Sequence, residues 1–237
     1  TLGGNIGLPI LGQDALPSGG IYVLELSSYQ IDLTQSLDCD VAVLLNITPD
    51  HLDRYDGFAG YAASKARLFA MQSAGHPAVI ATEDDETRRI AGPVKSLVEV
   101  KSSSVTDQSG WPALQGPHNA QNAAVAIAAA RPLGVDEAAI AKGLQTYPGL
   151  PHRMERIVER NGVLFVNDSK ATNPSSSSFA LASYPAIHWI LGGLPKGDRL
   201  DECVPMFGNV RAAYVIGDAA PVFAKLLEAA GKPVTMS

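Results

Sequence analysis

The sequence predicts an α/β fold built on parallel sheets, and three observations lead to this prediction. Short apolar runs rich in β-branched residues recur along the 237 residues, helix-like stretches lie between several of them, and polar or glycine-rich loops follow them. Continuous apolar runs are typical of strands that are buried on both faces. Strands that alternate with helices are typical of parallel sheets, so we expect that arrangement here.

The expected elements follow from these runs in chain order. Strands are expected at residues 21–26, 41–45, 78–81, 163–166, 188–191 and 213–216. Helices are expected at residues 58–74, 120–130, 136–146, 174–183 and 221–230. Asn173 suits the N-cap of the fourth of these helices, and Pro174 suits its first position. A further strand is expected to begin just before Ser237.

The segment "YPGLPHR", residues 147–153, separates two groups of expected elements. It contains two prolines and a glycine, which end one helix before a new strand begins. We therefore expect one domain at residues 1–148 and a second at residues 149–237. Ligands of open parallel sheets bind beyond the carboxyl ends of the strands, so the polar loops are expected to line a cleft between the domains.

The composition argues against several classes of function. The 18 basic and 24 acidic residues leave a net charge of −6, and no Lys/Arg cluster offsets it, so we expect no nucleic-acid partner. We also expect no membrane span and no signal peptide, because no apolar run is long enough. Cys39 and Cys203 match no metal-binding spacing and suit a reducing compartment. These observations favour a cytoplasmic protein, which we expect to be a monomer.

Two loops carry candidate metal ligands. Glu25 lies near the end of an expected buried strand, where a carboxylate is costly unless it is paired or bound to a cation. A structural salt bridge is the alternative to a metal site there. The loop "NITPDHLDRY" offers Asp50, His51 and Asp53. Either aspartate could instead cap the next helical turn, and His51 could be an ordinary histidine, since Mg²⁺ prefers oxygen ligands.

Other candidates lie on helices and in a glycine loop. Lys65 is in an expected amphipathic helix, where a lysine usually occupies the solvated face. Its ammonium group cannot bind a metal, whereas a carbamate on the same side chain would provide an oxygen ligand. Asn119 suits the N-cap of the alanine-rich helix, and with Asn122 it could hold a purine or a phosphate. The loop "GGLPKG" presents Lys196 to a carboxylate or phosphate. The chain contains no Walker A motif.

Seven motifs occur in order along the chain: "GGNIG", "ELSSYQ", "NITPDHLDRY", "GPHNAQNAA", "GLPHRME", "NDSKATN" and "GGLPKGD". Together they resemble the Mur ligase family, ATP-dependent enzymes that build the peptide stem of bacterial peptidoglycan. The resemblance covers essentially the whole chain, and "DSKATN" is similar to the member that adds D-glutamate. It implies that residues 1–148 are most of a central ATPase domain and residues 149–237 the first part of a Rossmann-like C-terminal domain. A UDP-binding domain, the P-loop and the last strands would then lie outside the chain.

The resemblance also implies a reaction and its site residues. ATP would phosphorylate the carboxylate of UDP-N-acetylmuramoyl-L-alanine, and the amine of D-glutamate would attack the acyl phosphate. His51 and a carbamylated Lys65 would be catalytic. By motif, Mg²⁺ would be held by Glu25, His51 and Lys65, and ATP would be bound by Asn122, Arg153 and Asp168. The muramoyl substrate would contact Asn5 and Ser27, and D-glutamate would contact Lys170, Thr172 and Lys196.

Two rival functions stay open at this point. A non-catalytic remnant that binds nucleotide or muropeptide is favoured by the missing Walker A motif, whereas the intact metal and hinge motifs favour an enzyme. The alternative enzymes are a sister ligase, meaning a Mur ligase that adds a different residue, and a folylpolyglutamate synthase. The motif "SKATN" argues against a sister ligase that adds diaminopimelate or lysine.

Overall fold

The structure is a computed structural model that describes residues 1–194, 197 and 199–237. The chain divides into two compact units. The first unit contains residues 1–101 and 125–135, and the second contains residues 102–124 and 136–237. Helix α4 (Pro117–Ala130) contributes residues to both. The domain boundary expected between residues 148 and 149 stays a prediction.

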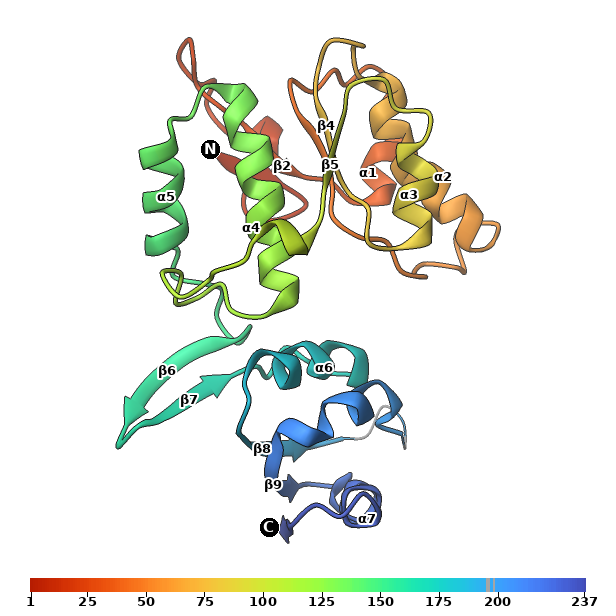
Figure 1. The fold of residues 1–237 in the computed structure, drawn as a ribbon. Coiled ribbons are helices and arrows are strands. Elements are labelled where there is room, and N and C mark those ends of the chain that lie inside the picture. The colour runs from red at the N-terminus through yellow and green to blue at the C-terminus, as the bar shows by residue number, and fades with distance from the viewer. Residues whose placement is uncertain (195–196, 198) are drawn as a thin grey trace. The chain divides into compact units, whose positions relative to one another are not determined.

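The first unit contains two parallel sheets. Its strands are β1 (Leu2–Gly4), β2 (Val23–Glu25), β3 (Ala42–Leu44), β4 (Ala78–Ala81) and β5 (Leu97–Val100). β1 pairs with β2, while β3, β4 and β5 pair in that order in the other sheet. Its main helices are α1 (Ser28–Leu33), α2 (Gly57–Met71) and α3 (Asp85–Ala91), which follow β2, β3 and β4 respectively (Figure 1).

The core of the first unit is centred on strand β4. All four residues of β4 are buried, which explains why this strand is a continuous apolar run. Ile80 of β4 packs in one cluster with Tyr61 and Ala62 of α2 and with Ile90 of α3. Helices α2 and α3 therefore cover the same face of the sheet, as Figure 1 shows.

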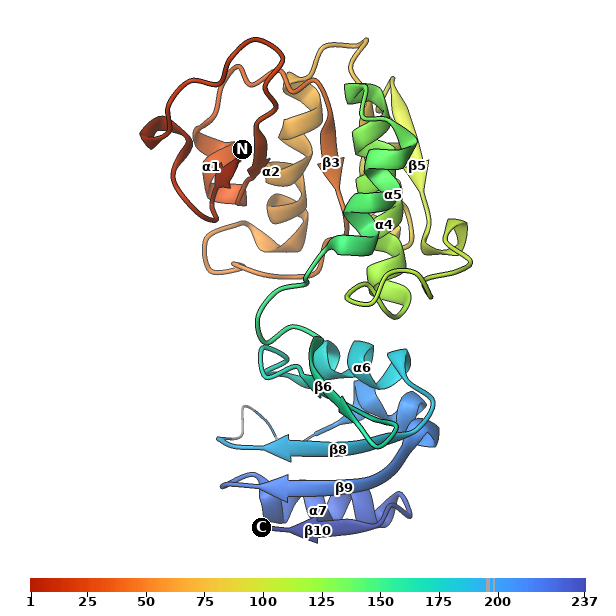
Figure 2. The same cartoon turned by 90° about the vertical axis from the view of Figure 1, so that its left-hand side faces the viewer.

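The second unit contains a three-stranded parallel sheet with the order β10–β9–β8. These strands are β8 (Ile187–Gly192), β9 (Val210–Ile216) and β10 (Val234–Met236), and they lie side by side in Figure 2. The helices of this unit are α5 (Glu137–Thr146), α6 (Pro174–Ser183) and α7 (Ala220–Ala229), with a 3₁₀ helix at Asp201–Asn209. The parallel sheets of both units confirm the predicted α/β fold class.

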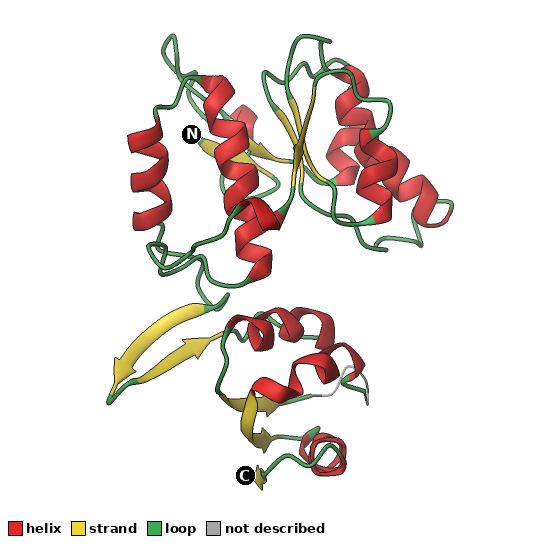
Figure 3. Cartoon of the chain, viewed as in Figure 1, coloured by secondary structure: helices red, strands yellow, loops and turns green. Residues whose placement is uncertain are grey.

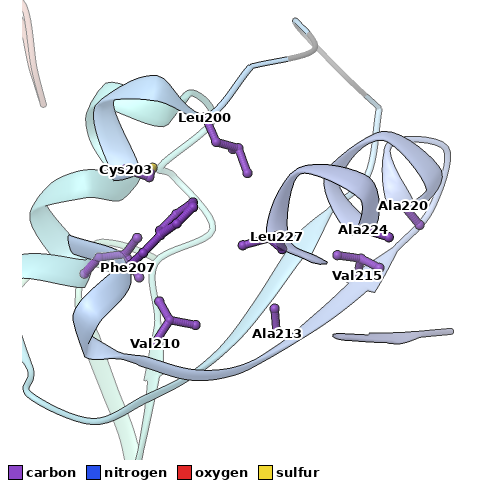
Figure 4. Close-up of a cluster of buried hydrophobic side chains, with 10 residues drawn as sticks. Leu200, Cys203, Phe207, Val210, Ala213, Val215, Ala220, Ala224 and Leu227 are labelled. Atoms are coloured by element: carbon purple, nitrogen blue, oxygen red, sulfur yellow. The ribbon is translucent and has the colours of Figure 1, made fainter. Parts of the chain in front are cut away.

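A hydrophobic cluster joins the elements of the second unit (Figure 4). Ala213 and Val215 of the central strand β9 are fully buried and face Leu227 of α7. Cys203 and Phe207 of the 3₁₀ helix extend the same cluster. Since β9 is the middle strand of its sheet, this cluster fixes the sheet, α7 and the 3₁₀ helix to one another.

Strands β6 (Glu155–Arg160) and β7 (Val163–Asn167) form an antiparallel hairpin, which Figure 3 shows as two long yellow arrows joined at one end. The strand expected at residues 163–166 is therefore present, but its partner was not expected. Four of the six β6 residues are charged, so β6 lacks an apolar run. The turn residues Asn161 and Gly162 both have positive φ, at 53° and 73°. An Asn-Gly pair favours this conformation and is the signal that could have predicted the hairpin.

The helix starts test two capping predictions. The Asn173 side chain accepts a hydrogen bond from the Ser176 N–H at 2.8 Å, and Pro174 occupies the first turn, so the predicted cap of α6 is confirmed. The N-cap role that was the alternative to ligand binding at Asn119 is not found, because α4 already begins at Pro117. The side chain of Asn119 instead donates to the Gln115 carbonyl oxygen at 3.0 Å.

We expect Leu227→Ala to destabilise the second unit. Leu227 is fully buried in the cluster around β9, so truncation should lower the free energy of unfolding by about 2–5 kcal/mol. Leu226→Ala is the matched control, because Leu226 is its neighbour in α7 but is 37% exposed. Both tryptophans, Trp111 and Trp189, lie in the second unit, so their fluorescence in urea reports its unfolding. Equal losses in the two variants would contradict the packing described here.

Candidate functional site

His51 and Lys65 meet at one aromatic ring in the first unit. The ring centroids of His51 and Tyr61 lie 6.1 Å apart, and the Lys65 Nζ lies 5.2 Å from the Tyr61 centroid. Tyr61 is 7% exposed and precedes Lys65 by one turn of α2, which places both side chains on one helix face. Lys65 is half-buried, so it does not project fully into solvent as the alternative interpretation expected. The structure thus brings two of the predicted site residues together.

The loop that carries His51 has an unusual backbone conformation. His51 has a φ of 52°, a left-handed conformation that costs a residue other than glycine on the order of 1–3 kcal/mol. Asp50 accepts a hydrogen bond from the His51 N–H at 2.8 Å, and the imidazole packs edge-on against Tyr29 of α1, with centroids 5.0 Å apart. The Asp50 side chain therefore stabilises the backbone of this loop and does not cap α2. The N-cap residue of α2 is Asp56, whose side chain makes no capping bond.

Asn5, Glu25 and Ser27 lie at the carboxyl ends of β1 and β2. The Asn5 N–H donates to the Glu25 carbonyl oxygen at 2.8 Å, which continues the pairing of the two strands. Gly4 is required beside this contact, because its φ is 101° and a Cβ there would lie 2.2 Å from the Glu25 oxygen. Ser27 caps α1: its Oγ accepts from the Gln30 N–H at 3.3 Å, and the Gln30 side chain accepts from the Ser27 N–H at 2.9 Å.

The Glu25 side chain is exposed at this edge. Within the described residues it forms no ion pair, so the structural salt bridge considered from the sequence is not found. The capping role of Ser27 was missed in the sequence, although the Ser-x-x-Gln spacing of a capping box was its signal.

The residues expected to bind metal match the ligand preferences of Mg²⁺ only in part. In the part of the chain that the structure describes, no group of three or more His, Cys, Asp or Glu side chains is placed to hold an ion. Mg²⁺ usually takes one or two protein carboxylates and completes its shell with water and substrate phosphates. The exposed carboxylate of Glu25 fits that pattern, whereas Lys65 in its ammonium form offers no ligand. His51 offers a nitrogen, which Mg²⁺ takes less readily than oxygen.

Arg153 and Asp168 lie close together in the second unit. The Asp168 Oδ1 accepts a hydrogen bond from the buried Met154 N–H at 2.9 Å. Burial raises the pKa of Asp168 above its ordinary value, although the Met154 N–H and the nearby positive charge of Arg153 act in the opposite direction. Arg153 itself is exposed. Arg153 is thus near enough to influence Asp168, and their role in nucleotide binding stays a prediction. Asp168 also has a structural role that the sequence analysis missed.

The "NDSKATN" loop is bound to the "LPHR" loop through the backbone. The Lys170 N–H donates to the His152 carbonyl oxygen at 3.0 Å, and the Asn167 amide lies 2.8 Å from the His152 Nδ1. His152 has a φ of 62°, and Met154 one of 49°, so this loop needs such restraints. The side chains of Lys170 and Thr172 are exposed and available to a ligand. His152 and Asn167 were not predicted, although both lie inside motifs that the sequence analysis quoted.

Asn122 is placed by a short chain of amide contacts at the start of α4. Its Nδ2 donates to the Asn119 Oδ1 at 3.3 Å, and Asn119 in turn donates to the Gln115 carbonyl oxygen. Asn122 is half-buried, which suits a residue that offers its remaining amide groups to a ligand. Lys196, predicted to face D-glutamate, lies outside the described residues.

These features define an α/β protein in which Glu25, Ser27 and His51 follow the carboxyl ends of parallel strands, the usual place for ligands of such sheets. Asp168, Lys170 and Thr172 instead follow β7 of the antiparallel hairpin, so the expectation of a parallel edge was wrong for them. Residues 1–113 match the Mur ligase middle domain. This part of the chain therefore belongs to the Mur ligase family.

The similar proteins agree with this membership. The chain is 63% identical to the UDP-N-acetylmuramoylalanine–D-glutamate ligase of Novosphingobium aromaticivorans, over 100% of the chain and 54% of the relative. It is 58% identical to the enzyme of the same name from Zymomonas mobilis, over 97% of the chain and 53% of the relative. The chain thus spans about half the length of the curated relatives it matches.

Solved structures share the fold at low sequence identity. MurC of Thermotoga maritima has a TM-score of 0.67 at 16% identity, over 92% of this chain and 55% of that one. MurF of Acinetobacter baumannii has a TM-score of 0.64 at 23% identity, over 91% of this chain and 55% of the MurF chain. The S73A mutant of L. casei FPGS has a TM-score of 0.61 at 14% identity, over 91% of this chain and 63% of the FPGS chain. At these identities the likeness concerns the fold alone.

We expect substitutions of Asp168 to separate its structural role from its charge. Asp168→Ala should lower the free energy of unfolding of the second unit by about 1–3 kcal/mol, because the buried Met154 N–H loses its acceptor. Asp168→Asn keeps an oxygen acceptor and removes a charge that burial disfavours, so at pH 7 it should be at least as stable as the wild type. Urea unfolding followed by tryptophan fluorescence measures both.

The pH dependence gives a second readout for the same residue. Since the pKa of Asp168 is raised in the folded state, the folded protein binds more protons than the unfolded chain between the ordinary value of 3.8 and the raised value. The contribution of Asp168 to the free energy of unfolding therefore falls as the pH rises through that interval, and Asp168→Asn should lack this fall. Parallel pH profiles for the wild type and Asp168→Asn would contradict the raised pKa.

Proposed function

We propose that the protein containing these residues is an ATP-dependent ligase that joins D-glutamate to UDP-N-acetylmuramoyl-L-alanine during peptidoglycan precursor synthesis. The observation that carries this proposal is 63% identity over the whole chain to a relative with that name. Identity of this order over the whole chain supports a shared substrate and not only a shared fold.

The geometry of each unit supports the same activity. In the first unit, His51 and Lys65 meet at Tyr61, and the exposed Glu25 lies at the carboxyl end of a parallel strand. In the second unit, the charge of Arg153 acts on Asp168, and the side chains of Lys170 and Thr172 in the following loop are exposed. We assign the first set to the phosphate and metal side of the reaction and the second set to nucleotide and D-glutamate.

The proposed reaction has two steps. The substrate carboxylate attacks the γ-phosphorus of ATP, which releases ADP and leaves an acyl phosphate. The amine of D-glutamate then attacks the acyl carbon, loses a proton and expels inorganic phosphate as the amide forms. Several negative charges meet in the first step, so positioning and charge compensation are the main tasks of the protein. Bound Mg²⁺ would supply part of that compensation, with Glu25 and His51 as its protein ligands and Lys65 as a third ligand once carbamylated.

The remaining residues would bind and orient the reactants. Arg153 offers the planar cation that suits a phosphate, and Asn122 offers amide groups to the nucleotide base. Asn5 and Ser27 lie at the strand ends where the muramoyl substrate would enter. Thr172 and Lys196 would supply a hydroxyl and a cation for D-glutamate.

We further place the protein in the cytoplasm, where ATP is available, as a monomer without nucleic-acid or membrane partners. The two cysteines are unpaired, and burial raises the pKa of the Cys203 thiol to about 11, which keeps it protonated and unreactive. No helix among the described residues combines the length and apolar character needed to cross a membrane.

The assay that tests the proposal is phosphate release from ATP. We expect the full-length enzyme to release phosphate only when UDP-N-acetylmuramoyl-L-alanine and D-glutamate are both present. Residues 1–237 alone should not turn over, because they contain no Walker A loop to hold the β- and γ-phosphates. Efficient use of another amino acid by the full-length enzyme would favour a sister ligase, and use of folate a folylpolyglutamate synthase. Absence of turnover with every acceptor would favour a non-catalytic binding protein.

We expect Thr172→Ala and Lys196→Ala to weaken the use of D-glutamate selectively. Loss of a charge-assisted hydrogen bond costs about 1.5–3 kcal/mol, which should raise the KM for D-glutamate by roughly 10–150-fold for Lys196→Ala. The KM for ATP should stay within about twofold. Lys225→Ala, which removes an exposed lysine from α7, is the charge-matched control. Unchanged D-glutamate kinetics in both variants would remove these residues from the pocket.

A further inference from the structure

Asp32 receives hydrogen bonds from three side chains of two other segments. The Ser64 hydroxyl donates to its Oδ1 at 2.6 Å, and the Tyr55 hydroxyl donates to its Oδ2 at 2.8 Å. The Arg54 guanidinium donates to the same Oδ2 at 3.4 Å. Asp32 lies on α1, Arg54 and Tyr55 lie in the loop after β3, and Ser64 lies on α2. One carboxylate therefore ties three segments of the first unit together.

The environment keeps this carboxylate charged. Its side chain is only 23% exposed, and Ser64 is 5% exposed. Burial alone would raise the pKa of Asp32, but the hydrogen bonds from Ser64, Tyr55 and Arg54 outweigh it and lower the pKa below the ordinary value. A carboxylate that accepts from three donors in this way is a strong and directional anchor.

Each bonded partner is adjacent to a residue of the candidate site. The Arg54 N–H donates to the His51 carbonyl oxygen at 3.0 Å, and the Arg54 guanidinium lies 4.4 Å from the centroid of Tyr29, the ring that packs against the His51 imidazole. Ser64 immediately precedes Lys65 in α2. The helix that carries Asp32 is capped by Ser27.

We propose that Asp32 is a positioning residue that holds the His51 loop and the Lys65 turn of α2 in the arrangement the reaction requires. It touches neither reactant and acts through Arg54, Tyr55 and Ser64. The strained backbone of His51 makes such an anchor necessary, because the loop would otherwise relax to a more favourable φ. The importance of Asp32 for catalysis rests on the proposed function, whereas its effect on the position of His51 and Lys65 does not.

Asp38 provides a matched control in the same unit. It also ties a segment that follows α1 to the end of α2, since its carboxylate accepts from the Ser73 N–H at 2.8 Å and lies 2.9 Å from the His76 Nδ1. Ser73 and His76 are not adjacent to any candidate site residue. Asp32→Asn and Asp38→Asn thus remove the same charge from two similar anchors, only one of which faces the site.

The first measurement is nuclear magnetic resonance of residues 1–237, which needs no activity. We expect wild type to show contacts between the His51 and Tyr29 rings and between the Lys65 side chain and Tyr61. Asp32→Asn should reduce the intensity of both sets to less than about half, while Asp38→Asn should keep them, since only the Asp32 anchor supports the loop. Retention of these contacts in Asp32→Asn, or equal loss in both variants, would overturn the proposal. If Asp32→Asn does not fold, Tyr55→Phe removes one hydroxyl from the same anchor and is expected to weaken the His51 contacts.

The second measurement uses the full-length enzyme. Asp32→Asn should lower kcat by at least about tenfold with the KM for ATP within about twofold, because displacing a catalytic group by an ångström can cost far more than that in rate. Asp38→Asn should have nearly normal kinetics, and Asp32→Glu should restore part of the lost kcat. Loss of kcat with intact ring contacts would overturn the positioning role. Failure of the wild-type enzyme to ligate would reject the proposed function, while the resonance experiment would still decide the role of Asp32.

Discussion

Parallel pairing of the strands is the constraint on which the rest of the structure depends. A parallel neighbour can be reached only by a crossover connection, so the carboxyl ends of β3, β4 and β5, and those of β8, β9 and β10, each lie at one edge of their sheet. The chain must leave each of these edges through a loop. Those loops carry His51 after β3, while Glu25 and Ser27 occupy the equivalent edge at the end of β2. The positions of Glu25, Ser27 and His51 are therefore a consequence of the strand direction.

Loops have no sheet partners of their own, and this protein stabilises two of them with carboxylates. Asp32 holds the His51 loop through side chains, whereas Asp168 holds the "LPHR" loop through the buried Met154 N–H. The two carboxylates respond differently to their surroundings. The hydrogen bonds lower the pKa of Asp32, while burial dominates at Asp168 and raises its pKa. Asp32 therefore stays ionised down to a lower pH than an ordinary aspartate, whereas Asp168 takes up a proton more readily than one.

Structural and functional tasks overlap in several residues of this family member. Ser27 caps α1 and also lies where a substrate is proposed to bind, and Asn122 shares an amide contact with Asn119 at the start of α4. A side chain that already has one fixed hydrogen bond loses less conformational entropy when a ligand binds. This overlap explains why a motif such as "ELSSYQ" combines a capping box with proposed substrate contacts.

The sequence by itself determined the local features of the fold. The continuous apolar run of β4, the limits of α6 and the cap at Asn173 follow from side-chain preferences within a few residues, and the structure has all three. Local preference was not sufficient at Asn119, because Pro117 is an equally good helix start and α4 begins there. The charged strand β6 shows the same limit, since only its Asn-Gly turn and its pairing with β7 make it a strand.

The tertiary structure decided which side chains meet. Asp32 and Ser64 are 32 residues apart, and Met154 and Asp168 are 14 residues apart, so no periodic pattern connects them. Lys65 could be read from sequence only as a lysine on an amphipathic helix. Its place beside the Tyr61 ring follows from their four-residue spacing on α2, but the packing of His51 against that ring depends on how the loop after β3 packs on α2. Such contacts arise from the free energy of the whole unit, because burial and long-range hydrogen bonds are shared among segments that are distant in the chain.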